Sequence, residues 1–299
     1  MNIKSRYFFF VLIITLFLAT ACSSNPVNET GTKADNFGIL WEVSQSEVIS
    51  CYLFGTIHSE DARVTELPEP VNTAFNSANT LALEMQLDKD TAREVMKSLY
   101  FTDGRHLKPI IGDDLYFQSV KAMVKKGLPE RIVNKMKPWA VFTVLNMPEQ
   151  RTGLFLDAIL FQTAKQQGKT IHGLETQQEQ TAVFDEMSLD SQIALLKSTL
   201  ENMLDMDKLQ DEAIDVYLTR DLNKILALND KYESLIDEKL AKEFTQRLVT
   251  DRNYRMVKRM TPLLKAGNCF VAVGALHLPG EEGILTLLKQ QGYRVQAVY

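Results

Sequence analysis

The sequence predicts an α/β domain with a central mixed, mostly parallel sheet and a large helical cap. Three observations indicate this fold class: apolar strand-like runs alternate with helical patterns, two of these runs end in Gly-x-x-His, and a long charged helical stretch contains no strand pattern of its own. The chain has 299 residues, of which 45% are apolar, so it can bury a substantial core. Its 33 basic and 38 acidic residues form no basic stripe, and a nucleic-acid partner is therefore not expected.

The N-terminal segment, residues 1–21, is predicted to be a signal peptide. Basic residues precede an apolar run from Tyr7 to Leu18, which falls short of the about 20 residues needed to span a bilayer. Cys22 follows small residues in a pattern similar to a lipobox, although Ala19 stands where Leu is usual, and Ser23 resembles a residue that permits sorting to an outer membrane. We therefore expect a lipoprotein anchored to the outer membrane and facing the periplasm. The alternative is ordinary cleavage, which gives a soluble periplasmic protein.

The folded domain is expected to begin after a flexible tether. Residues 22–36 are mostly polar and offer almost nothing to bury, so residues 37–299 are expected to hold the α/β domain. The pattern over Gly38–Val43 and Cys51–Phe54 predicts two strands joined by a polar turn, and the second strand leads to His58.

A strand, a helix and another strand follow one another at this point. A helix is expected over Pro70–Ala78, where Pro suits the first turn, and a strand over Thr80–Glu84. Two strands connected through a helix imply a parallel crossover. The pattern then stays mostly helical up to Gly168, which is expected to end a helix over Leu154–Gln167, and the next strand is Thr170–Leu174.

The segment after that strand begins with a capping box. Thr176 and Glu179 have its spacing, which places Glu175 between a strand end and a helix N-terminus, a common location of catalytic groups. The elements expected in the remainder are a helical region over about 188–266, a strand over Asn268–Val273, a helix over Gly283–Gln291 and a strand over Tyr293–Val298.

Two apolar strands end in the same short motif, Gly55-Thr56-Ile57-His58 and Gly274-Ala275-Leu276-His277. Glycine lets the backbone turn sharply or approach a ligand, and the carboxyl ends of parallel strands meet at one edge of a sheet, where α/β proteins bind ligands. One such motif is weak evidence, because a single His beside an apolar run is usually a packed or surface residue. Two motifs on strands predict one shared site, to which the strand-end residues Glu84 and Glu175 also belong.

Several segments, in the same order, resemble the TraB/PrgY/GumN family. They are Leu53–Asp61, Leu81–Glu84, Gly173–Thr176, Arg252–Asn253 and Gly274–Glu281. The match covers nearly all of the predicted domain and is more specific than either His motif alone. That family is related to Tiki metalloproteases, and more distantly to erythromycin esterases and ChaN-like haem-binding lipoproteins, so the resemblance implies a metal-dependent hydrolase.

The strand-end residues suit a divalent metal site. Two imidazoles and one or two carboxylates, with water at an open position, form a usual catalytic metal set. We predict His58 and His277 as ligands, and Glu84 as either the third ligand or the base that activates water. Glu281 is a further ligand candidate, because Pro279-Gly280 can fold that segment back over the site; its alternative role is to stabilise a helix start. Zinc fits by ligand type, whereas the resemblance through Tiki favours manganese or cobalt.

Two more catalytic candidates have open roles. Glu175 serves the site or caps the helix that follows it. Arg252, which resembles the family's Arg-Asn element, stabilises an oxyanion, holds a substrate carboxylate or forms a structural ion pair. His106 and His172 do not follow strand ends and are predicted to be structural.

The favoured function is an exported metal-dependent hydrolase, a peptidase according to the resemblance, acting on a peptide or small-molecule substrate. The alternative is a non-enzymatic surface lipoprotein that binds haem, iron or a peptide. Glu84 together with Arg252 favours catalysis, because a haem ligand set does not require an acid and a cation together. The chain has no Gly-x-Ser-x-Gly motif, so a Ser-His-Asp hydrolase is poorly supported.

The two cysteines of the domain, Cys51 and Cys269, are predicted to be buried thiols. Cys51 lies seven residues before His58 and Cys269 lies eight before His277. Histidines at equivalent positions would therefore place the cysteines on opposite faces of the sheet. A disulfide is the alternative, since an exported protein enters an oxidising compartment.

Overall fold

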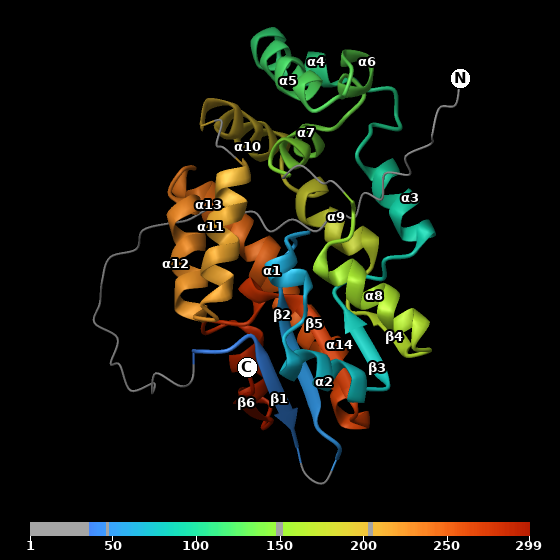
Figure 1. Ribbon diagram of the computed structural model, residues 1–299. Coiled ribbons are helices and arrows are strands. Elements are labelled where there is room, and N and C mark those ends of the chain that lie inside the picture. The colour runs from blue at the N-terminus through green and yellow to red at the C-terminus, as the bar shows by residue number, and fades with distance from the viewer. Residues whose placement is uncertain (1–35, 46–47, 148–151, 203–205) are drawn as a thin grey trace, which may run out of the picture.

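The computed structural model describes residues 36–45, 48–147, 152–202 and 206–299. Its centre is a six-stranded sheet in the order β4–β3–β5–β2–β1–β6 (Figure 1). The strands are β1 (Leu40–Ser44), β2 (Cys51–Thr56), β3 (Thr80–Leu83), β4 (Thr170–Gly173), β5 (Cys269–Gly274) and β6 (Arg294–Ala297). Strands β4, β3, β5 and β2 run parallel, whereas β1 pairs antiparallel with both β2 and β6. The predicted fold class, a mixed and mostly parallel sheet, is confirmed.

Burial across the sheet explains the composition of its strands. β5 lies in the middle of the parallel part, and all six of its residues are buried, so its sequence is a continuous apolar run. β4 and β6 form the two edges and alternate exposed with partly buried residues, including His172 and Gln296. The two Gly-x-x-His motifs therefore extend from strands at the centre of the sheet.

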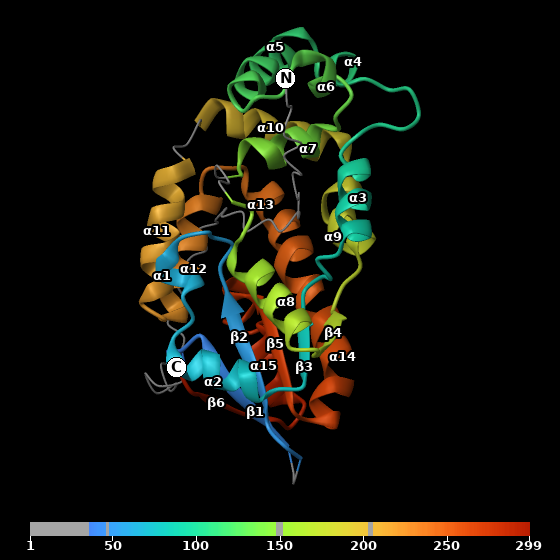
Figure 2. The ribbon, with the colours of Figure 1, turned by 45° about the vertical axis from the view of Figure 1, so that its right-hand side comes forward.

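Helices cover both faces of the sheet. α2 (Glu69–Ser77) and α8 (Leu156–Gln166) lie on one face, and α14 (Asp251–Ala266) and α15 (Ile284–Gln290) lie on the other (Figure 2). This placement follows from the parallel crossovers, because each crossover helix returns the chain over one face of the sheet. A short helix, α1 (Ala62–Thr65), follows the first His motif.

A helical lobe with its own core lies beyond the carboxyl ends of the parallel strands (Figures 1 and 2). All eight residues of α7 (Pro138–Leu145) are buried, because this helix runs through the middle of the lobe. Phe142, Phe184 and Phe244 form an aromatic cluster there. Trp139 stacks on Phe184 with 5.6 Å between ring centroids. The other helices of the lobe are α3 (Lys89–Ser98), α4 (Leu107–Ile111), α5 (Asp113–Lys125), α6 (Glu130–Val133), α9 (Gln177–Asp185), α10 (Leu189–Asn202) and α13 (Glu238–Thr245).

The predicted helical region over about 188–266 is observed. Between α10 and α14 the chain forms α11 (Met206–Leu218), α12 (Leu222–Glu233), α13 and a π-helix, η1 (Gln246–Thr250). The described residues of this region contain no strand of the sheet. η1 leads directly into α14, so the region ends in the helix that covers one face of the sheet.

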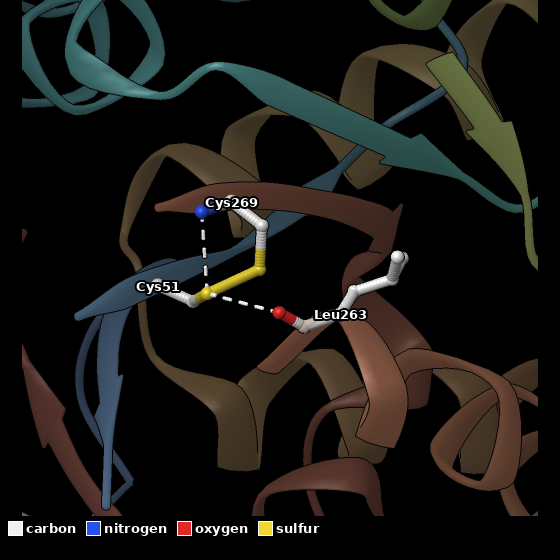
Figure 3. Close-up of a disulfide and its surroundings, with 3 residues drawn as sticks. All are labelled: Cys51, Leu263 and Cys269. Atoms are coloured by element: carbon white, nitrogen blue, oxygen red, sulfur yellow. Dashed lines mark hydrogen bonds between the residues drawn. A yellow bond between two sulfur atoms is a disulfide. The ribbon is translucent and has the colours of Figure 1, made fainter. Parts of the chain in front are cut away.

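Cys51 and Cys269 form a disulfide, which corrects the prediction of two buried thiols (Figure 3). Their Cα atoms are 4.6 Å apart, and both residues are buried. The prediction was wrong because the two His motifs are out of step by one residue: the register of β2 and β5 pairs Thr56 with Gly274. The same register places the two cysteines opposite each other. The bond joins β2 and β5 at the ends away from the histidines.

The predicted signal peptide and the predicted tether up to residue 35 lie outside the described residues. The first described residues already contact the domain, because Phe37 forms an isolated β-bridge with Asp221. No helix in the described ranges combines the length and the apolar character needed to cross a bilayer.

Candidate metal centre at the sheet edge

Four parallel strands bring the predicted site residues to one edge of the sheet. Glu84 directly follows β3, and Glu175 lies two residues after the end of β4. His58 follows β2, and His277 ends a short 3-10 helix, η2 (Ala275–His277), that continues from β5. The neighbouring strand ends are in backbone contact, because the Glu175 amide donates to the Glu84 carbonyl at 2.7 Å. The sequence therefore placed these four residues at the correct ends of their strands.

The motif glycines permit close backbone approach at this edge. A Cβ on Gly55 would lie 2.7 Å from Leu278 Cδ1 and 3.1 Å from Ala275 Cα, so glycine lets η2 pack against the end of β2. A Cβ on Gly274 would lie 3.3 Å from Glu84 Oε1, and the Gly274 amide donates to that oxygen at 2.7 Å. The absence of a side chain at Gly55 thus allows close packing, and its absence at Gly274 leaves space for the Glu84 carboxylate.

Glu84 is a buried and ionised carboxylate. Its Oε1 accepts from the Gly274 amide, and its Oε2 accepts from Arg252 at 2.5 Å. Burial raises the pKa of Glu84. The charges of Arg252 and His277 and the Gly274 hydrogen bond lower it by more, so that the pKa is about 2. Glu84 therefore carries a negative charge throughout the neutral range.

His277 is held in one tautomer by Asn253, the second residue of the predicted Arg-Asn element. His277 Nδ1 lies 2.6 Å from Asn253 Oδ1. The amide orientation is fixed on its other side, because Asn253 Nδ2 donates to the Glu282 carbonyl at 2.8 Å. Nδ1 must then carry the proton, and Nε2 keeps its lone pair, 3.7 Å from Glu84 Oε1. Burial and the charge of Arg252 lower the pKa of His277 to about 4, so the ring is neutral at pH 7.

Arg252 and Glu175 form the support behind Glu84. Arg252 lies in the first turn of α14, directly after the π-helix, and its Nε donates to Glu175 Oε2 at 2.9 Å. Its remaining nitrogens donate to Glu84 and to the Leu248 carbonyl. Burial lowers the pKa of Arg252, but the two carboxylates raise it above its ordinary value, so the guanidinium stays charged. Glu175 also accepts from Arg255 at 2.7 Å.

The contacts of Glu175 distinguish its two predicted roles, which are to serve the site or to cap α9. The predicted capping box is confirmed, with Thr176 as the N-cap of α9. The Glu179 amide donates to the Thr176 hydroxyl at 3.2 Å, and the Thr176 amide donates to the Glu179 carboxylate. Glu175 is not part of this cap. Its carboxylate is directed to Arg252 and Arg255, which places it with the site.

His58 is supported by the start of α8 rather than by α14. Its Nδ1 lies 3.2 Å from Asp157 Oδ2, and its ring packs on Phe155 with 4.3 Å between centroids. His58 Nε2 is buried and has no hydrogen-bond partner among the described residues. An imidazole nitrogen left without a partner at a polar site is an available ligand atom.

Three neighbours of the candidate site residues were not predicted from the sequence. Asp157 contacts His58, Asn253 was not assigned a role of its own, and Gln180 of α9 places Nε2 at 3.3 Å from Glu175 Oε2. Asp157 had a detectable signal, because an acid at the spacing of Leu160 and Ala164 lies on the apolar face of its helix. No local signal marked Gln180.

Glu281 does not join this group. It is exposed in the turn after η2, and no ion pair or hydrogen bond to Glu84, His58 or His277 is present among the described residues. Its role as a ligand stays a prediction. His106 and His172 are also exposed, and neither follows a parallel strand into the site.

The donor atoms present fit a divalent ion in kind. They are two imidazole Nε2 atoms and one ionised carboxylate, a set that suits zinc, manganese or cobalt. In the described part of the chain, no three His, Cys, Asp or Glu side chains are gathered closely enough to hold an ion. His277 Nε2 lies 3.7 Å from Glu84 Oε1, and the unpartnered His58 Nε2 follows the adjacent strand β2.

Parallel strands that bring two histidines and two glutamates to one sheet edge, where a helix adds an arginine, define an α/β protein with a candidate metal centre. The model of the TraB/PrgY/gumN family matches residues 39–297, and the chain belongs to that family. This finding confirms the resemblance carried by the separate sequence segments.

Curated relatives are Tiki metalloproteases. The chain is 25% identical to metalloprotease TIKI2 of Danio rerio over 92% of this chain and 63% of the relative. It is 26% identical to metalloprotease TIKI1 of Xenopus tropicalis over 98% of this chain and 68% of the relative. A metalloprotease TIKI homolog of Nematostella vectensis is 25% identical, over 96% and 75%. The chain spans 63% and 60% of the two TIKI2 relatives it matches. No solved structure gives a significant match.

Proposed function

We propose that this protein is an exported metal-dependent hydrolase that cleaves peptide bonds, with His58 and His277 as metal ligands. The observation that carries the proposal is the common state of the two imidazoles. Nδ1 of each ring faces an oxygen atom, at 3.2 Å for His58 and 2.6 Å for His277, so Nε2 of each is left to bind an ion. Relatives named metalloproteases support a peptide substrate over a small molecule.

Glu84 serves in this proposal as the third ligand rather than as the base. A general base works best with a pKa near the working pH, whereas the pKa of Glu84 is about 2. A carboxylate that stays ionised is well suited to a cation. When bound, the ion would supply a water of lowered pKa and polarise the carbonyl to be cleaved.

Arg252 and Glu175 act as positioning residues for Glu84. The Arg252 guanidinium is already engaged with two carboxylates and a carbonyl, which supports electrostatic positioning over direct contact with substrate. Glu175 in turn fixes the guanidinium plane through two contacts, at 2.9 Å to Nε and 2.7 Å to a terminal nitrogen.

Metal removal tests the function. Protein purified without chelator is expected to contain bound manganese, cobalt or zinc by elemental analysis and to cleave members of a quenched fluorescent peptide library. Dialysis against EDTA should abolish cleavage, and addition of Mn²⁺, Co²⁺ or Zn²⁺ should restore it, which also identifies the metal. Cleavage that survives complete metal removal would contradict the proposal. A Soret band in the purified protein would instead support the haem-binding alternative.

The proposed location is the periplasmic side of the outer membrane, with a lipid on Cys22. The disulfide between Cys51 and Cys269 supports export, because such bonds persist in oxidising compartments. The protein should fractionate with membranes, and Cys22→Ala should release it into the soluble periplasmic fraction. Recovery of the parent protein wholly in the soluble fraction would exclude the lipid anchor and leave ordinary cleavage.

A further inference from the structure

Asp157 is a buried acid beside the proposed metal ligands. It occupies the first turn of α8 and is 3% exposed. Oδ1 accepts from the Thr56 hydroxyl at 2.9 Å, and Oδ2 lies 3.2 Å from His58 Nδ1. Oδ2 has no hydrogen-bond partner in the described part of the chain. A buried carboxylate oxygen without a partner is costly, so its presence at this position calls for a function.

We propose that Asp157 is the positioning residue for His58: it holds the proton on Nδ1 and thereby presents the Nε2 lone pair to the metal. The inference rests on the proposed function, in which His58 is a ligand. Metal-bound histidines commonly donate their other ring N–H to a carboxylate, which fixes both the tautomer and the ring orientation. Asp157 and His58 have the atoms and the separation for this arrangement.

Neighbouring residues fix the orientation of both the Asp157 carboxylate and the His58 ring. Thr56, the last residue of β2, holds one carboxylate oxygen, so only the other oxygen faces the ring. Phe155, immediately before α8, packs on the imidazole and limits its rotation. The contact between Nδ1 and Oδ2 has the distance but not the alignment of a hydrogen bond, and such contacts commonly tighten when a site is filled.

Replacing the acid by its amide tests this role, because an amide whose oxygen keeps the bond from Thr56 presents a donor to His58. In Asp157→Asn the amide oxygen should keep the bond from the Thr56 hydroxyl, which turns the NH2 group towards His58 Nδ1. A donor at that position requires an unprotonated Nδ1, so the proton moves to Nε2 and blocks the lone pair. The substitution preserves size while reversing the tautomer.

Two measurements follow on Asp157→Asn and the parent protein. Two-bond ¹H–¹⁵N spectra of metal-free protein with labelled histidine are expected to show His58 protonated on Nδ1 in the parent and on Nε2 in the variant. Titration with Co²⁺ alone, followed by visible absorbance, is expected to show an affinity about 10–100-fold lower in the variant. Circular dichroism and urea unfolding check that the variant folds.

Asp185→Asn is the matched control. Asp185 accepts from Trp139 and Lys137 in the helical lobe, and its loss should leave the His58 tautomer and Co²⁺ affinity at the parent level. A parent protein with His58 protonated on Nε2, or a variant that binds Co²⁺ as tightly as the parent, overturns the inference about Asp157. A parent protein that binds no metal overturns the proposed function instead, and the tautomer measurement still decides the role of Asp157.

Discussion

The same motif ends two neighbouring strands, but different helices support its histidine at each end. Behind His58, α8 supplies the carboxylate of Asp157, one oxygen of which has no other partner. Behind His277, α14 supplies the amide of Asn253, which is locked in place by the Glu282 carbonyl. The short motif therefore determines where each imidazole lies, whereas a residue from a separate helix determines which nitrogen carries the proton.

Charge explains why the two ends use different acceptors. Around His277, Glu84 is already paired with Arg252, and a neutral amide adds no further charge to this buried group. No arginine or lysine contacts Asp157 among the described residues; burial and the charge of Glu84 raise the pKa of Asp157, whereas His58 and the Thr56 hydrogen bond lower it. His58 and His277 thus carry the proton on the same nitrogen, although a carboxylate faces the first ring and a neutral amide faces the second.

The largest effect is expected from removing either histidine, which tests whether the two ends act as one site. His58→Ala and His277→Ala should each lower metal affinity by more than the about 100-fold that an indirect change can cause, and the double variant should be little worse than either single one. Equilibrium dialysis with elemental analysis measures this. His172→Ala, at an exposed position of β4, should bind metal like the parent. If each single variant lost about half of the bound metal and the double variant lost the sum, the two histidines would belong to two independent sites.

An intermediate effect is expected from making the acceptors alike. Asn253→Asp removes the amide N–H that donates to the Glu282 carbonyl and places a carboxylate against that oxygen. The free energy of unfolding, measured with urea, should fall by about 1–3 kcal/mol. Asn72→Asp, on the exposed face of α2, is the control and should be nearly neutral. Equal stability of the two variants would mean that the His277 end tolerates a carboxylate as the His58 end does.

The smallest effect concerns pH. The pKa of His277 is about 4 in the folded protein and near 6.5 in the unfolded chain, so the unfolded state binds the extra proton between these values. Stability should therefore be unaffected above pH 6.5 and fall as the pH decreases towards 4, by about 2 kcal/mol at pH 5. Urea unfolding at pH 7, 6 and 5 measures the slope, which His277→Gln should flatten. An unchanged slope in that variant would assign the pH dependence to other groups.

Much of the fold was predictable because its signals are local. Every strand of the sheet begins and ends within two residues of the range predicted for it, and the capping box marked the start of α9. The four strand-end residues were predictable because parallel strands must end at a common edge. Helix Leu154–Gln167 was also predicted, but the burial of Asp157 within it depends on packing against β2.

The errors and omissions share a different cause: each depends on how two elements far apart in the sequence lie against each other. The disulfide was only the alternative prediction because two similar motifs suggested equal registers, whereas β2 and β5 pair with the two motifs offset by one residue. Asn253 and Gln180 reach the site from helices whose orientation no single segment encodes. Contacts between elements far apart in the chain determine these features.

The place of β5 in the sheet sets an order of assembly. β5 is formed by residues 269–274, yet it lies between β2 and β3, which are both complete by residue 83. During synthesis the edges of the first strands therefore stay unpaired until β5 has been made. His277, Arg252 and Asn253 all belong to the last fifth of the sequence, so a chain that ends before them carries only His58 and Glu84 of the three proposed ligands. The proposed activity would then require the chain to be made at least as far as His277.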